Sequence, residues 1–206
     1  MATKIVTKKE NKLGNYINIP DFNLDIVVFP IIGTNRLVMH KFSEKARKQI
    51  EDKQQKKSNS LEVKGKRDPQ AEYEACIHYC DDGTPGFPGG GFKKSLVRAA
   101  QGLDMKMTEA RSMFQVMDDL VPIEGEHRMR TDMVRLNGKT ADVRYRAEFP
   151  NWRANLRIRF NPNRISANQL ATLVRLAGFS VGVGEYRPEK DGSWGTFDID
   201  GKFNNE

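Results

Sequence analysis

The sequence predicts an α+β protein in which an antiparallel sheet carries its helices on one face. Three observations support this fold class. Residues 142–149 and 154–160 alternate strictly between apolar and polar side chains, as half-buried strands do. The pair Asn137-Gly138, which favours tight hairpin turns, precedes them. A helical pattern then begins at residue 166, so strands and helices are interleaved along the chain.

The first half of the chain contains short strand patterns and one surface helix. Apolar runs at 24–32 and 37–42 are predicted strands, separated by a Gly-Thr-Asn turn. Ser43 fits the N-cap of a helix that reaches about residue 55. Strand-like composition returns over residues 73–80.

The domain organisation follows from length and composition. A chain of 206 residues fits one domain, which we place at residues 16–206 after a flexible polar arm over 1–15. Residues near 53–69 lack hydrophobic periodicity and are predicted to form a mobile basic insertion. Cys76 and Cys80 lie four residues apart, too far for a disulfide within a strand, and are expected to be reduced.

Two further helices and a hairpin complete the prediction. Residues 92–103 place apolar side chains on one helical face, and Thr108 caps a short helix that follows. Ser166 and Gln169 form a capping box for a helix that Gly178 is expected to end. Strands at 179–184 and 194–199 would form a last hairpin. The order of elements suggests a ferredoxin-like sheet.

Composition restricts the class of partner. The net charge of +7 and the isoelectric point of about 9.4 favour polyanionic partners. No apolar run approaches the ~20 residues that cross a bilayer, and the N-terminus lacks the apolar core of a secretory signal. We therefore expect a cytoplasmic protein with no membrane partner.

Arginines occupy the polar face of two successive predicted strands. If these strands pair, their guanidinium groups lie about 5 Å apart across the sheet and repel each other unless an anion such as phosphate neutralises them. Alternatively, carboxylates of the same chain neutralise them (Glu148, Asp142, Glu124 or Glu126), or the face is simply solvated. The predicted nucleic-acid-binding residues on this face are Arg144, Arg146, Arg153, Arg157 and Arg159.

A glycine-rich segment over residues 182–195 is a second candidate site. Glycines allow a backbone to approach a phosphate closely, and aromatic rings can stack on bases. We predict phosphate contacts at Gly182 and Gly184, with Arg187 and Lys190 adding charge and Tyr186 and Trp194 stacking. The alternative is an ordinary hairpin with a packed tryptophan.

A third candidate precedes a basic helix. Backbone N–H groups at a helix N-terminus attract anions, so the glycines before this helix are predicted to contact phosphate. A flexible lead-in or tight packing would explain the same glycines. The residues concerned are Gly89, Gly90 and Gly91, followed by Lys93, Lys94 and Arg98.

Catalytic signals are sparse. His40, His78 and His127 are scattered without ligand spacing, and Asp118-Asp119 fits a turn better than a metal site. We therefore predict no catalytic residue, no metal and no cofactor.

Three segments carry a resemblance to a known family. Residues 31–46, 86–93 and 182–197 resemble a family of proteins encoded by tailed bacteriophages, over about residues 20–200. More loosely, the Gly-Thr turn and the late glycine-rich hairpin resemble the RAMP superfamily, which includes RNA-binding backbone subunits of CRISPR effector complexes. The resemblance implies a modified ferredoxin-like fold, binding of RNA or another single strand, and assembly of several copies.

The expected function is therefore non-enzymatic binding of single-stranded RNA or DNA, with self-association along the strand, in the host cytoplasm if the protein is phage-encoded. One alternative is a protein-interaction module that acts on a host defence complex or in the virion. A second is a metal-independent RNA nuclease of ferredoxin-like fold, for which His40 is the only candidate acid–base.

Overall fold

A computed structural model describes residues 23–41, 67–136 and 140–201. The predicted arm over 1–15, the helix after Ser43 and the Asn137-Gly138 turn lie outside these residues, as does most of the basic insertion near 53–69. Within the described ranges, no helix is both long and apolar enough to span a membrane.

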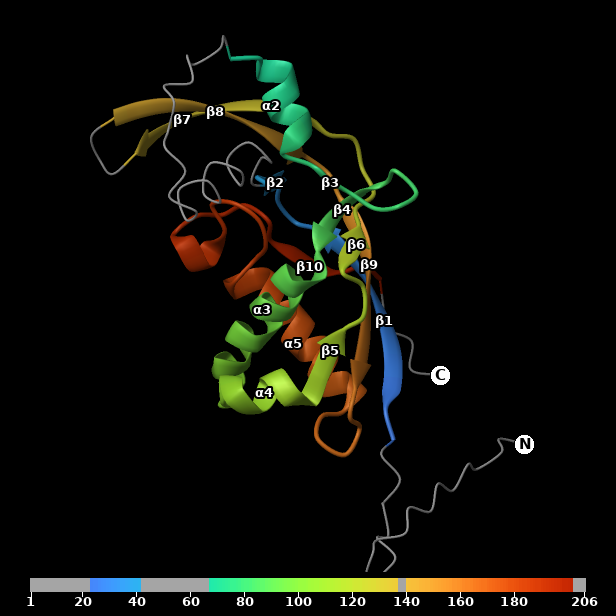
Figure 1. The fold of residues 1–206 in the computed structure, drawn as a ribbon. Coiled ribbons are helices and arrows are strands. Elements are labelled where there is room, and N and C mark those ends of the chain that lie inside the picture. Colours follow the sequence, from blue (N-terminus) through green and yellow to red (C-terminus); the bar gives the residue numbers. More distant parts are fainter. Residues whose placement is uncertain (1–22, 42–66, 137–139, 202–206) are drawn as a thin grey trace, which may run out of the picture.

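A four-stranded antiparallel sheet forms the centre of the molecule (Figure 1). It contains β1 (Asp25–Gly33), β5 (Phe114–Val116), β9 (Arg153–Phe160) and β10 (Phe197–Ile199), in the order β10-β1-β9-β5. Side chains along β9 alternate between exposed and buried without interruption, so Leu156 and Ile158 enter the core as the sequence pattern predicts.

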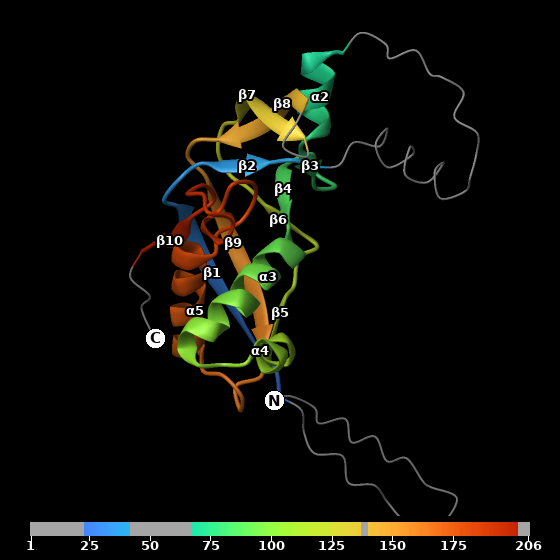
Figure 2. The ribbon, with the colours of Figure 1, turned by 90° about the vertical axis from the view of Figure 1, so that its left-hand side faces the viewer.

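The helices that pack on this sheet cover one of its faces, which Figure 2 turns towards the viewer. They are α3 (Gly89–Ala99), α4 (Met107–Met113) and α5 (Ala167–Ser180), with a 3₁₀ turn, η1 (Ala100–Leu103), between the first two. Phe92 and Leu96 of α3 and Leu173 of α5 are fully buried. The predicted class, an antiparallel sheet with helices on one face, is confirmed for this sheet.

Two smaller antiparallel sheets lie towards the end of the molecule that is farther from α4 (Figure 1). The hairpin sheet contains β2 (Leu37–Met39), β8 (Thr140–Phe149) and β7 (Arg128–Leu136), in that order. The third contains β3 (His78–Tyr79), β4 (Pro85–Pro88) and β6 (Leu120–Pro122). Helix α2 (Pro69–Ala75) packs against β8, and a second 3₁₀ turn, η2 (Pro188–Lys190), follows α5.

A tryptophan fixes the joint between the central sheet and the hairpin sheet. The chain passes from β8 to β9 through Pro150–Trp152, and from β1 to β2 through residues 34–36. Trp152 is buried, and its indole Nε1 donates a hydrogen bond to the Asn35 carbonyl at 2.9 Å. A Cβ at Gly33 would lie 2.1 Å from that nitrogen, so only glycine permits this packing.

Two local predictions in the middle and at the end of the chain are wrong. Tyr73 lies in α2, because Asp68 caps a helix that has Pro69 in its first turn, and β3 covers only His78–Tyr79. Residues 179–184 do not form a strand; they complete α5 and enter a loop, so β10 pairs with β1 instead.

The capping box at the start of α5 is confirmed, but the prediction for its end is wrong. Ser166 Oγ accepts a bond from the Gln169 backbone N–H, and Gln169 Oε1 accepts from the Ser166 N–H. Gly178 lies inside the helix. Gly182, with a φ of +69°, adopts the left-handed conformation expected after a helix, and its N–H donates to the Ala177 carbonyl.

Candidate nucleic-acid interface

The predicted arginine platform does not form, because β8 and β9 do not pair. The hydrogen-bonded neighbours of β8 are β7 and β2, whereas those of β9 are β1 and β5. The turn of the chain at Trp152 directs the two strands into different sheets. Arg144 and Arg146 therefore lie on the hairpin sheet, and the remaining three arginines lie on the central sheet.

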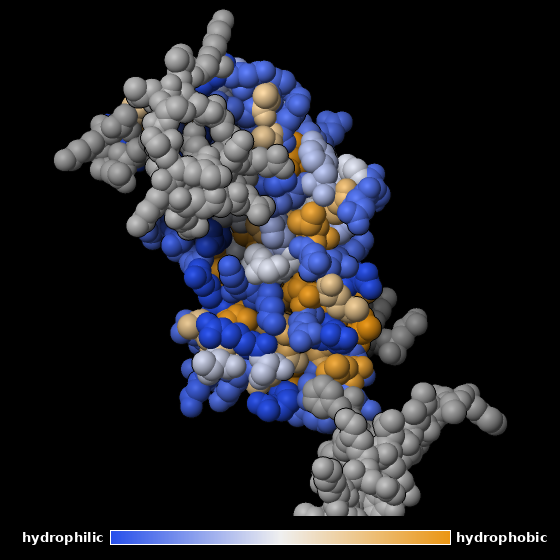
Figure 3. All heavy atoms as spheres, viewed as in Figure 1, coloured by the Kyte–Doolittle hydropathy of each residue, from blue (hydrophilic) through white to orange (hydrophobic). Residues whose placement is uncertain are grey.

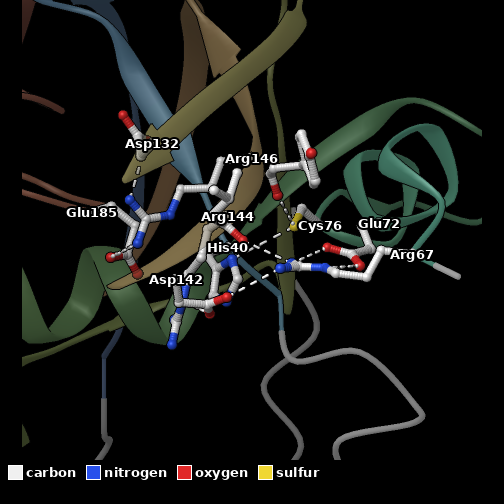
Figure 4. Close-up of polar contacts among 11 residues, drawn as sticks. His40, Arg67, Glu72, Cys76, Asp132, Asp142, Arg144, Arg146 and Glu185 are labelled. Atoms are coloured by element: carbon white, nitrogen blue, oxygen red, sulfur yellow. Dashed lines mark hydrogen bonds and ion pairs between the residues drawn. The ribbon is translucent and has the colours of Figure 1, made fainter. Parts of the chain in front are cut away.

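Carboxylates of the same chain pair with the two arginines of β8 (Figure 4). Arg146 is 8% exposed and contacts Asp132 at 3.1 Å and Glu185 at 3.7 Å. Arg144 lies 3.7 Å from Asp142. Internal neutralisation, the alternative considered from the sequence, thus describes this part of the cluster, but only Asp142 is among the carboxylates that it named.

The arginines of β9 have weaker partners. Arg153 lies 3.5 Å from Asp200 and Arg157 lies 3.1 Å from Asp118, and both arginines are largely exposed. Arg159 donates to the neutral amide oxygen of Gln115 at 2.7 Å. Exposed ion pairs contribute little to stability, so an external anion can replace these internal partners at small cost.

Residues of β7 that the sequence analysis missed complete a charged surface on the hairpin sheet. In the register of the two strands, Arg128 faces Glu148, Arg130 faces Arg146 and Asp132 faces Arg144. The sequence signal was incomplete, because a two-residue Asn137-Gly138 turn would pair Leu136 with Lys139, whereas the observed register pairs Leu136 with Thr140 and so differs by one position. We call these six residues the charged hairpin face: Arg128, Arg130, Asp132, Arg144, Arg146 and Glu148.

Glu148 is the anchor of this face. It is 3% exposed and accepts hydrogen bonds from Arg36 at 2.7 Å, Arg128 at 2.8 Å and Arg130 at 3.2 Å. Burial alone would raise the pKa of the Glu148 carboxyl, but the bonds from Arg128 and Arg36 outweigh it and hold the pKa below its usual value. Glu148 is therefore ionised at neutral pH.

The late glycine-rich segment lies beside the charged hairpin face. The Arg130 guanidinium stacks on the Trp194 ring, 4.4 Å from the ring centroid. Tyr186 packs edge-on against Trp194, with 5.0 Å between centroids, and remains 54% exposed. The alternative prediction that Trp194 is packed within the protein is thus correct, while Tyr186 still presents an aromatic surface to solvent.

The two glycine-rich segments, predicted as separate candidates, line one cavity of about 340 Å³. Lys94 and Arg98 of α3 and Arg187 of the late segment bring positive charge to it. Glu189 pairs with Arg98 and with Arg187, and Glu185 connects the cavity to Arg146. The other lining residues are Met39, His40, His78, Phe87, Pro88, Gly91, Ser95, Val181, Gly182, Val183 and Gly184.

His40 and His78 line this cavity, which their scattered positions in the sequence did not reveal. Burial, with a further contribution from Arg146, lowers the pKa of His40, so its imidazole is neutral at pH 7. Its Nδ1 lies 3.5 Å from Cys76 Sγ, which donates to the Tyr145 carbonyl. Burial raises the pKa of the Cys76 thiol, which therefore stays protonated and unreactive.

Close packing explains several of the glycines. Gly184 has a φ of +78°, and a Cβ there would lie 2.6 Å from the Val38 carbonyl oxygen. A Cβ at Gly89 would lie 1.9 Å from the Asp118 carbonyl oxygen, and the Gly89 N–H donates to Asp119. The tight-packing alternative therefore holds at Gly89, and close packing also requires glycine at position 184. Gly90 differs, because nothing lies within 4 Å of its Cβ position.

The remaining predicted residues lie outside the cavity. Lys93 is half-buried on α3, and Lys190 is exposed at the end of η2.

Cys76 and Cys80 are both free thiols. Within the described ranges, no group of three or more His, Cys, Asp or Glu side chains could hold a metal ion.

Comparisons with known proteins give a distant structural likeness and no match in sequence. No family model matches the chain, and a search of curated proteins found no match, so the resemblance to tailed-phage proteins gains no support. Among solved structures, the chain is similar to the crystal structure of Cmr6 from Pyrococcus furiosus, with a TM-score of 0.43 and 10% identity. The match covers 86% of this chain and 99% of that one. A likeness at this level carries no argument about function.

Proposed function

We propose that the protein binds single-stranded nucleic acid, RNA or DNA, without cleaving it. The strand would lie along a groove that begins at the cavity and continues over the charged hairpin face. The observation that carries this proposal is the convergence of both glycine-rich segments with Lys94, Arg98 and Arg187 on one cavity beside Arg146.

Electrostatics supports this placement. Lys94 is exposed and has no ion-pair partner among the described residues, and the Arg98 side chain is 44% exposed. Cations outnumber carboxylates in the cavity and on the charged hairpin face together. A phosphate can therefore displace Glu189 from Arg98 or join Lys94 directly, with release of bound counterions.

Tyr186 and the first turn of α3 supply the two other kinds of contact. The exposed Tyr186 ring, held in place by Trp194, is suited to stack on one base. Helix α3 begins without a side-chain cap, so its first-turn N–H groups other than that of Gly89, which donates to Asp119, can point at a phosphate. Both contacts are independent of sequence, which favours binding with little base specificity.

We propose that the central sheet is a modified ferredoxin-like unit of the kind implied by the RAMP resemblance. Its order β10-β1-β9-β5, with α3 between β1 and β5 and α5 between β9 and β10, matches the βαββαβ plan. The hairpin strands β7 and β8 are then an insertion between β5 and β9. Assembly of several copies along one strand remains part of the proposal.

A paired charge reversal tests the groove. In Lys94→Glu/Arg98→Glu, the affinity for fluorescein-labelled oligouridylate and oligothymidylate of about 15 nucleotides should fall at least tenfold in fluorescence anisotropy, because two phosphate contacts become repulsive. The labelled RNA should stay intact on a denaturing gel.

The matched control is Lys106→Glu/Arg111→Glu, which changes the net charge equally at exposed positions at the α4 end of the molecule (Figure 1). Its affinity should change less than threefold. Equal losses in the two variants would show that binding depends only on net charge, and the groove would then be wrong.

A further inference from the structure

We infer that the face of the central sheet opposite α3 and α5 is a docking surface for a protein partner, an acidic amphipathic helix. We call it the open sheet face. Among the described residues, no helix or strand covers it (Figure 1). This inference does not rest on the proposed function, because no residue of the open sheet face lines the cavity.

The open sheet face carries a row of exposed apolar side chains along β1. Ile26 is 57% exposed and Val28 is 46% exposed, and Leu24 continues the row at 40%. Pro30 is exposed in the same alternation. In Figure 3, apolar residues reach the right-hand edge of the lower half, where β1 runs in Figure 1. Single exposed apolar residues are common on protein surfaces, whereas a continuous row marks an interaction site.

A row of arginines runs beside this apolar row. Arg159 is the cross-strand partner of Ile26, Arg157 that of Val28, and Arg153 that of Ile32. Cross-strand partners lie about 5 Å apart, so the two rows form adjacent stripes along one face. Asp118 and Asp200 neutralise the arginines only in part, because Arg159 bonds to the neutral Gln115.

The chemistry of the apolar row favours a protein over a nucleic acid. Bases bind to proteins by stacking on aromatic rings, and this row is aliphatic throughout. A sheet buries its second apolar face by packing against a helix or another sheet. A helix with one apolar stripe and acidic residues along one flank would satisfy both the apolar row and the arginine row.

Charge also argues for a partner rather than the chain's own remaining segments. Lys4, Lys8, Lys9 and Lys12 outnumber Glu10 and Asp21 in residues 1–22, and residues 42–66 are basic as well. Neither segment complements a row of arginines. The occupant that does is an acidic segment of another protein.

The test measures binding of the full chain to three labelled synthetic helices of about five turns, a length that spans β9. One has an apolar stripe with a glutamate flank, the second the same stripe with a lysine flank, and the third the acidic composition in scrambled order. The first should bind at least tenfold more tightly than the other two. Equal binding of the scrambled peptide would overturn the proposal, because charge alone would then explain it.

Two variants locate the site. Ile26→Ser/Val28→Ser and Arg157→Glu/Arg159→Glu should each weaken peptide binding at least tenfold, and both should melt close to the parent because the altered side chains are exposed. Lys94→Glu/Arg98→Glu should leave peptide binding unchanged, which separates this proposal from the nucleic-acid groove. Unchanged binding in Ile26→Ser/Val28→Ser, or full displacement of the peptide by oligouridylate, would show that the open sheet face is not a protein-docking surface.

Discussion

At the scale of single residues, the glycines show how one residue type serves opposite requirements. Gly178 lies in the interior of α5, where alanine normally stabilises a helix. A Cβ there, however, would lie 1.9 Å from the Phe197 carbonyl oxygen, so β10 can approach α5 only at a glycine. Gly90 lies in the first turn of α3 with open space around it.

The same substitution should therefore have opposite effects at the two positions. Gly178→Ala is expected to lower the free energy of unfolding by about 2–3 kcal/mol through overpacking. Gly90→Ala should leave it unchanged or raise it by up to about 0.5 kcal/mol, because only the entropy of the unfolded chain changes. Urea denaturation of both variants measures the difference. A stable Gly178→Ala would contradict the contact with Phe197.

The sequence could not separate these roles. A glycine near the end of a helical pattern is compatible both with a left-handed cap and with close approach of another strand. The outcome depends on where β10 lies, and only tertiary structure decides that. For the same reason, the sequence did not show that His40 and His78 line one cavity. They lie 38 positions apart, and no motif links them.

At the scale of elements, the β7–β8 hairpin is held by one buried carboxylate. Glu148 receives bonds from Arg36, which precedes β2, and from Arg128 and Arg130 of β7. The carboxylate thus ties together all parts of the hairpin sheet. Removing its charge leaves Arg36 and Arg128 without this counter-ion, whereas Arg130 keeps its ion pair with Asp132 at 2.8 Å.

Glu148→Gln should accordingly lower the free energy of unfolding at pH 7 by about 2–3 kcal/mol. The folded state holds the pKa of Glu148 below its ordinary value, so the stabilisation is complete above the unfolded pKa of about 4.3 and is lost as the pH falls through the folded pKa. The difference between the variant and the parent should therefore shrink below about pH 4. Thermal melts across this range measure it.

Glu126→Gln is the control for Glu148→Gln, because Glu126 is an exposed carboxylate beside the same hairpin. It should change the free energy of unfolding by less than about 0.5 kcal/mol. A parent-like Glu148→Gln at pH 7 would show that the three arginines do not depend on this carboxylate.

Elements with a strong local signal were predicted well. The capping box of α5, the strict alternation of β9 and the apolar runs at β1 and β2 all depend on neighbours within a few residues. Residues 73–80 failed because aromatic and β-branched residues favour strands on average, whereas the Asp68 cap and Pro69 decide the local structure in favour of a helix.

At the scale of the whole molecule, the pairing of strands was the decisive unknown. Two consecutive alternating strands usually pair, and that expectation created the predicted arginine platform. Pairing of the two strands would require Pro150–Trp152 to act as a hairpin connection, but the packing of Trp152 on Gly33 makes these residues a joint between two sheets. Local patterns therefore gave the faces of these two strands and the β7–β8 hairpin correctly, but not the partners of β9.

The proposed groove has a measurable electrostatic consequence. For a single strand, the logarithm of the binding constant falls with the logarithm of the salt concentration, with a slope of about −0.7 per phosphate contact. Contacts by Lys94, Arg98 and Arg187 of the cavity would give a slope near −2, and Lys94→Glu/Arg98→Glu should bring it to about −0.7. A slope close to zero in the parent would contradict binding through phosphates.

The positions of the two tryptophans allow intrinsic fluorescence to report on two separate parts of the molecule. Trp152 is sealed at the joint between the sheets, and Trp194 lies under Arg130 at the edge of the groove. Their emission therefore arises from two different environments, one apolar and one beside a cation. Loosening of the joint would shift the emission of Trp152 to longer wavelength. A ligand in the groove that draws Arg130 away would change the emission intensity of Trp194. The native chain thus carries an optical probe at each location without any added label.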